Sequence, residues 1–65
     1  MKDFVGKDVK IVFQDGSDAK AIFGVIQSVD DFFINIIDNK SRMQSISLKS
    51  VIRIKEVTDG VYWNT

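Results

Sequence analysis

The sequence predicts one small all-β domain, and three observations lead to this prediction. Apolar and polar side chains alternate in several short segments, turn signals separate those segments about eight to twelve residues apart, and no segment has a convincing helical period. A chain of 65 residues has room for one domain only. We therefore expect a five-stranded barrel with a core over residues 6–57, a tail over 58–65, and at most a short N-terminal helix.

The first predicted strand follows Gly6-Lys7, where Val9, Ile11 and Phe13 alternate with polar residues. Asp15-Gly16 is a strong turn signal, because glycine readily adopts positive φ after a turn-forming aspartate. A second, longer strand is predicted over Ala19–Val29. Gly24 lies inside it, and a glycine within a strand commonly marks a bulge or a sharp bend.

The third predicted strand, Phe32–Asp38, contains five large apolar side chains in its first six residues. Both faces of such a strand are apolar, whereas a small sheet usually leaves one face to water. We expect the sheet to curl so that both faces are covered, or a second subunit to cover one of them. Only Asn35 interrupts the run, so this amide needs an explanation.

The last two predicted strands are Met43–Leu48 and Val51–Val57, joined by a tight turn at Lys49-Ser50. In the final strand we expect two side chains to point inward and two outward. These are Ile52 and Ile54 for the core, and Arg53 and Lys55 for the surface.

The composition argues against an enzyme. The chain has no Cys, no His and no Pro, so it lacks disulfides, zinc sites of the Cys/His kind, and the usual bases and thiol nucleophiles. Asp30 and Asp31 are adjacent and would point to opposite faces of an extended chain. We expect no catalytic residue, no metal and no cofactor. With no apolar run near the roughly 20 residues that span a bilayer, and no leader after Met1, we expect a soluble cytoplasmic protein.

Charge is divided unevenly although the net charge is zero. Residues 1–38 carry seven Asp against four Lys, and residues 39–56 carry five basic residues against Glu56 alone. Two interpretations of the basic residues stay open: they bind phosphate, or they form a solvated outer face. Tyr62 and Trp63 in the tail likewise either stack on a partner or cover an open end of the core. The five basic residues are Lys40, Arg42, Lys49, Arg53 and Lys55.

Asn35 also has two interpretations. Its amide could face inward and bond to a free carbonyl at a bulge. Alternatively it could lie at the mouth of the strand, braced by Asp31, with Phe33 beside it as a stacking platform. An amide can then read a base edge while the ring holds the base.

Taken in order, the motifs resemble those of the Sm-like family. The first family motif is matched by Gly6-Lys7-Asp8-Val9-Lys10-Ile11, Asp15-Gly16, Gly24-Val25-Ile26 and Asp31-Phe32-Phe33-Ile34-Asn35, and the second loosely by Leu48-Lys49-Ser50-Val51-Ile52. The segment from Gly24 to Asp31 is one residue longer than in the family, which implies a bulge.

This resemblance implies a strongly bent SH3-like barrel that forms a homo-oligomeric ring, with neighbouring subunits pairing their fourth and fifth strands. It also implies binding of single-stranded RNA. Phe33 would stack on a base, Asn35 would bond to it, Asp31 would orient Asn35, and Lys49 would stand where the family has arginine. The alternative is an SH3-like barrel that serves protein–protein assembly and has no nucleic-acid role.

Overall fold

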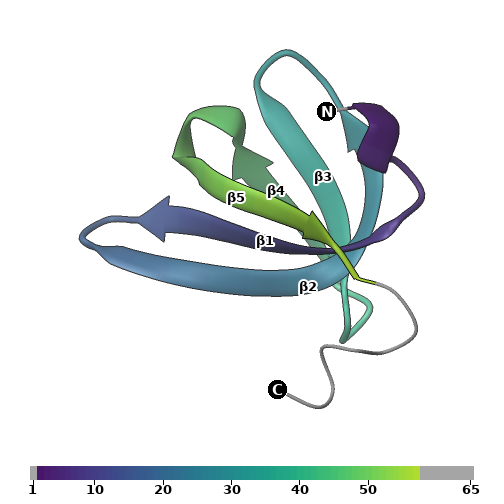
Figure 1. Cartoon of the computed structure of the whole chain (residues 1–65), viewed down its shortest axis with the longest axis horizontal. Coiled ribbons are helices and arrows are strands. Elements are labelled where there is room, and N and C mark those ends of the chain that lie inside the picture. Colours follow the sequence, from purple (N-terminus) through teal and green to yellow (C-terminus); the bar gives the residue numbers. More distant parts are fainter. Residues whose placement is uncertain (1, 58–65) are drawn as a thin grey trace.

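The computed structural model describes residues 2–57, which form five antiparallel strands in one sheet of order β4-β3-β2-β1-β5 (Figure 1). The predicted all-β class and the five strands are confirmed. Each strand lies within two residues of its expected position. The strands are β1 (Asp8–Asp15), β2 (Asp18–Val29), β3 (Phe33–Asp38), β4 (Met43–Ser47) and β5 (Val51–Glu56).

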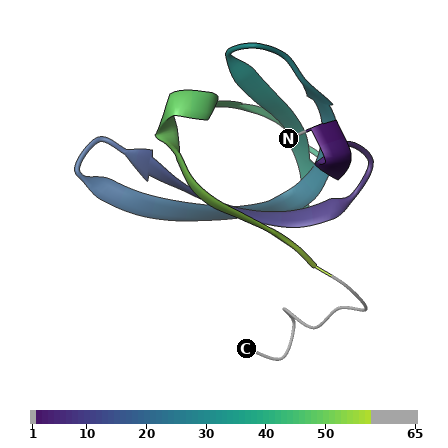
Figure 2. The same cartoon turned by 45° about the horizontal axis from the view of Figure 1, so that its top comes forward.

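The sheet bends strongly on itself but remains open, because β4 and β5 each pair with one neighbour only (Figure 2). The expected closure into a barrel within the single chain is therefore not observed. The β1–β2 hairpin extends from the body as an arm (Figure 1). Both open edges belong to strands that follow one another in the sequence.

One face of the bent sheet carries the core. Alternation in β1 sends every second side chain to this face, as the sequence predicts, and burial alternates in the same way along β3. The buried hydrophobic residues are all β-branched, which suits a pleated surface. They are Val9, Ile11, Ile26, Ile34, Ile36 and Ile46.

Gly24 lies in β2 where the backbone of β3 leaves no room for a side chain. A Cβ atom at this position would fall on the backbone carbonyl of Ile37 and within 2.9 Å of the Asp38 Cα. The bulge itself lies two to three residues further on, between Ile26 and Ser28. The extra residue expected between Gly24 and Asp31 is thus present at Gln27.

The inward orientation expected for Ile52 is wrong. The pairing of β5 with β1 shifts between Val12 and Phe13, so Arg53 pairs with Val12 and Val51 with Phe13. Ile52 is the extra residue of this bulge, and it is 57% exposed. Ile54, beyond the bulge, packs against the core as expected.

Two short 3-10 segments complete the described chain, which contains no α-helix within residues 2–57. The N-terminal segment η1 (Lys2–Phe4) is the short helix that the sequence allowed. The segment η2 (Leu48–Ser50) forms the expected tight connection at Lys49-Ser50. The two interpretations of Tyr62 and Trp63 concern residues outside the described range.

Candidate nucleic-acid interface

Asp30 fixes the loop between β2 and β3. Its Oδ1 atom accepts hydrogen bonds from the backbone N–H groups of Phe32 and Phe33, both at 2.8 Å. These bonds lower the pKa of Asp30, because they favour the charged carboxylate. The Asp30 N–H in turn donates to the Phe33 carbonyl at 3.0 Å. The loop is therefore a defined turn.

A second contact ties this loop to η2. The Leu48 N–H donates to the Phe32 carbonyl at 2.9 Å, so residues 30–33 and 48–50 lie side by side. We call these two segments together the loop end. They come from distant parts of the sequence, and Lys49 stands in the second of them.

Two aromatic side chains are presented at the loop end. Phe32 is 69% exposed and Phe33 is 45% exposed. Phe32 was expected in the third strand, but the strand starts at Phe33 because Asp30 holds the preceding residues in a turn. From the sequence, Phe33 alone was expected to stack on a base, although Phe32 is the more exposed ring.

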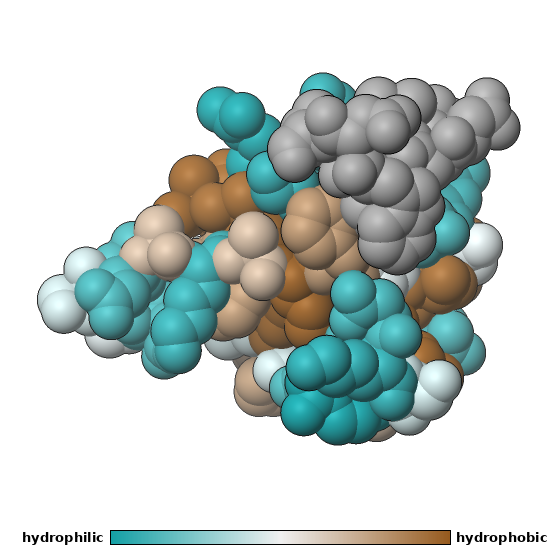
Figure 3. Space-filling model, turned by 90° about the horizontal axis from the view of Figure 1, so that it is seen from below, coloured by the Kyte–Doolittle hydropathy of each residue, from teal (hydrophilic) through white to brown (hydrophobic). Residues whose placement is uncertain are grey.

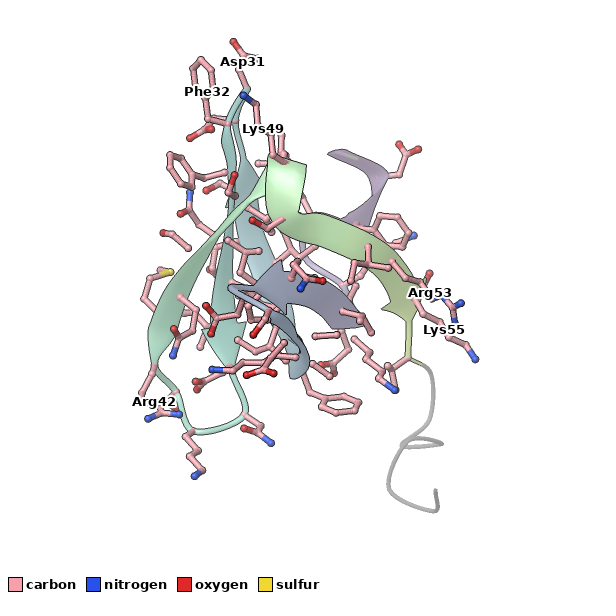
Figure 4. The ribbon with its side chains drawn as sticks, turned by 90° about the vertical axis from the view of Figure 1, so that its left-hand side faces the viewer. Asp31, Phe32, Arg42, Lys49, Arg53 and Lys55 are labelled. Carbon is pink, nitrogen blue, oxygen red and sulfur yellow. The ribbon has the colours of Figure 1, made fainter. Side chains whose placement is uncertain are left out.

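Asp31 and Lys49 lie at this same end. Figure 4 shows Asp31, Phe32 and Lys49 grouped together, with Arg42 at the opposite end of the molecule. Three of the four expected site residues, Asp31, Phe33 and Lys49, thus belong to the loop end. A carboxylate, an ammonium group and two rings on rigid backbone could hold a base and its phosphate.

The fourth, Asn35, lies two residues along β3 on the same face as Phe33. Its Nδ2 donates to Ser28 Oγ at 3.0 Å, and its Oδ1 accepts from Ser45 Oγ at 2.6 Å. These bonds connect β2, β3 and β4 on the outer face. Neither the inward interpretation nor the bracing by Asp31 matches this arrangement, because the described residues place serines at both ends of the amide.

Asn35 retains capacity for a ligand. A primary amide has two N–H donors and two acceptor lone pairs, and the serines use one of each. The Ser28 partnership depends on the bulge, which brings Ser28 opposite Asn35 in register. The alternation of side chains along each strand could not have predicted the hydrogen bond between Asn35 and Ser28.

The five basic residues do not form one surface. Lys49 is at the loop end, Lys40 and Arg42 lie in the turn after β3, and Arg53 and Lys55 point outward from β5 (Figure 4). Their proximity in sequence does not become proximity in space, because the turn and β5 lie at different edges of the sheet.

Arg42 is engaged by Asp38, a buried carboxylate. The Asp38 oxygens accept from the backbone N–H groups of Lys40 and Arg42, from Arg42 Nε at 3.2 Å and from Gln44 Nε2 at 3.2 Å. These bonds lower the pKa of Asp38 to about 2, with the Arg42 backbone contributing most. The arrangement shapes the turn around Ser41, whose φ is 63°.

The free edge of β4 presents backbone groups to solvent. The Leu48 N–H donates to the Phe32 carbonyl, and the Asp38 N–H donates to the Arg42 carbonyl. Because bonded residues alternate along an antiparallel pair, residues 42, 44, 46 and 48 are the ones that hydrogen-bond to β3. The N–H and C=O groups of Met43, Ser45 and Ser47 therefore face away from the sheet. The Val57 N–H donates to the Asp8 carbonyl. By the same alternation, the backbone N–H and C=O groups of Ile54 and Glu56 face the free edge of β5.

A groove of about 420 Å³ separates the β4 edge from the β1–β2 arm. Its apolar lining comes from Phe13, Ile22 and Ile46, and its rim includes the salt bridge between Lys20 Nζ and Asp15 Oδ2 at 2.6 Å. The groove runs beside the free backbone groups of β4. Its position suits an additional extended strand.

The side of the molecule seen from below is mixed in character. Figure 3 shows hydrophobic residues gathered near the middle of the face seen from below, with hydrophilic residues along the arm and the margin. Met43 at the β4 edge is 59% exposed. No helix within the described residues is long and apolar enough to cross a membrane, and no group of three or more metal-ligating side chains occurs there.

Comparisons with protein-family models, with curated proteins and with solved structures give no match for this chain.

Proposed function

We propose that this protein is an Sm-like, SH3-like barrel that assembles into a homo-oligomeric ring and binds single-stranded RNA. The observation that supports RNA binding is the loop end, where a rigid turn presents exposed aromatic rings beside Lys49. Base stacking on an aromatic ring is sequence-tolerant and contributes about 1–3 kcal/mol per base.

The residues have distinct roles in this proposal. Phe33 stacks on a base, and the free N–H and lone pair of Asn35 bond to its edge, while Ser28 and Ser45 hold the amide in position. Lys49 contacts phosphate. Because lysine lacks the planar guanidinium of arginine, its contribution is electrostatic. Asp31 places a negative charge near Lys49 at the loop end.

The ring in this proposal is built from the two open edges. The outward-facing backbone groups of β4 and of β5 are complementary donors and acceptors, and the groove beside β4 has room for a neighbouring strand. Pairing β4 of one subunit with β5 of the next would continue the sheet across the interface and satisfy both edges.

Binding can be tested by titrating fluorescent oligo-U and oligo-A with the parent protein and with Phe33→Ala and Asn35→Ala. We expect Phe33→Ala to weaken binding by about 1–3 kcal/mol, which is roughly 5- to 150-fold. Lys40→Ala, which removes one exposed cation at the opposite end, is the matched control and should bind within about twofold of the parent. Equal affinity of parent, Phe33→Ala and Asn35→Ala would refute the site.

A second candidate function is protein–protein assembly without any nucleic acid. The open β4 edge beside an apolar groove supports it, because an extended segment of another protein can add to such an edge. The same titration separates the two functions. A parent protein that assembles but binds neither oligonucleotide favours the assembly module.

A further inference from the structure

A second surface that could bind anions lies on the outer side of β1 and β5. Lys10 of β1 pairs directly with Lys55 of β5, and Arg53 follows two residues away on the same side of the strand. These side chains point away from the core, since their neighbours Ile11 and Ile54 point inward. We call Lys10, Arg53 and Lys55 the basic face.

The basic face has no carboxylate partner among the described residues. Three other cations do have one: Lys7 pairs with Glu56 at 3.6 Å, Lys20 with Asp15, and Arg42 with Asp38. Like charges directly opposite one another in an antiparallel pair are destabilising. An external anion would relieve the repulsion between Lys10 and Lys55, which gives this surface a preference for anionic ligands.

An aromatic ring adjoins the cations. Phe23 of β2 pairs with Lys10 on its other side, and Lys10 Nζ lies 5.7 Å from the centre of the Phe23 ring. Ala19 and Ala21 continue this side of β2 along the arm, and both are exposed. Small side chains leave the surface flat, so a long ligand could lie across it.

We propose that the basic face binds the phosphate backbone of a single-stranded nucleic acid without regard to base sequence. Arg53 and Lys55 stand two residues apart on one strand, a separation of about 7 Å. Three cations on one side of the sheet can contact several phosphates of a single strand. The basic face is separate from the loop end, since Arg53 and Lys55 lie apart from Lys49 (Figure 4). It does not depend on the function proposed above.

The test measures how binding of a fluorescent single-stranded oligonucleotide depends on salt. Each phosphate contact contributes about 0.7 to the slope of log affinity against log salt on a single strand, so three contacts contribute about 2. The variant Lys10→Gln/Arg53→Gln/Lys55→Gln should reduce the slope by about 2, equally for oligo-U and oligo-A. Glutamine retains a long stem that can pack as before.

The matched control is Lys7→Gln/Lys20→Gln/Lys40→Gln, which removes the same total charge elsewhere. It should keep the parental slope. Circular dichroism checks that both variants are folded. If the triple change in the basic face unfolds the chain, Lys55→Gln alone serves, because its exposed side chain makes no hydrogen bond or salt bridge within residues 2–57, and it should lower the slope by about 0.7.

Three outcomes would overturn this proposal. The basic-face variant could keep the parental slope, the control variant could lose as much slope as the basic-face variant, or the parent could bind poly-glutamate and neither oligonucleotide. The same measurements distinguish failure of the loop-end site from failure of the basic face. If Phe33→Ala and Asn35→Ala bind like the parent while the basic-face variant loses salt dependence, the proposal made here stands and the loop-end proposal fails.

Discussion

Asp38 shows how a single buried charge shapes this molecule. Its carboxylate accepts four hydrogen bonds from three residues of the turn and of β4, and it holds Ser41 in a left-handed conformation that favours glycine. Each bond favours the ionised form. The stability of the fold should therefore depend on the protonation of Asp38.

We expect acid to destabilise the protein between about pH 4 and pH 2. The folded-state pKa of Asp38 is about 2, below its unfolded value of 3.8. A lowered pKa contributes stability that is present above the unfolded value and lost as the pH falls through the folded value. Asp38→Asn should lower the thermal midpoint at pH 7 and flatten its acid dependence, since the amide nitrogen cannot accept from Arg42 Nε or Gln44.

Thermal melts monitored by circular dichroism at pH 7, 4 and 2 measure this effect. Asp18→Asn removes one negative charge from an exposed position at the hairpin end and controls for net charge. If Asp38→Asn melts like the parent at pH 7 and keeps the parental acid dependence, then Asp38 does not carry this stability.

At the scale of single residues, the sequence indicated which positions are unusual. It did not indicate which residues they bond to. Asn35 was recognisable because it interrupts an apolar run, but its partner Ser28 comes into register only through the bulge at Gln27. Asp30 and Asp31 look equivalent in sequence. Only Asp30 accepts the bonds that shape the loop, because the turn directs it towards the Phe32 and Phe33 N–H groups.

At the level of strands, alternation predicted which side chains point inward wherever pairing is regular. It did so for Val9 and Ile11 in β1, whereas in β3 both faces are apolar and the pattern did not indicate which one is buried. It failed at Ile52, where one extra residue in β5 changes the direction of the side chain. A bulge arises from the pairing between two strands, and the alternation within β5 contains no sign of this one.

The β4 edge gives a direct test of assembly through Ser47→Pro. The Ser47 N–H faces the free edge, and its φ of −62° already suits proline. The change should leave the monomer folded while it removes a donor from the proposed interface and places a ring there. We expect the dissociation constant of the oligomer to rise about tenfold or more. Light scattering over a dilution series measures it.

Ser47→Ala is the control, because it removes the hydroxyl and keeps the N–H. It should assemble like the parent. A folded Ser47→Pro protein with the parental mass at every dilution would show that the β4 edge is not the interface.

The whole molecule combines a small core with two open edges. The buried core consists of Val9 and five isoleucines, described above, and domains of this size have modest stability unless something else supports them. The chain has no cysteine to form a disulfide. The ring assembly proposed above would add stability and would link unfolding to protein concentration.

We therefore expect the thermal midpoint to rise by at least about 5 °C as the protein concentration increases from about 5 to about 500 µM, since partners that bind only the folded state stabilise it by mass action. Calorimetry at several concentrations measures the shift. Ser47→Pro provides the internal comparison: its midpoint should be lower than that of the parent at the same concentration, because its edge has lost one donor and pairs more weakly. A parent midpoint that stays constant across this range, together with a monomeric mass, would mean that the bent sheet is stable by itself with both edges open.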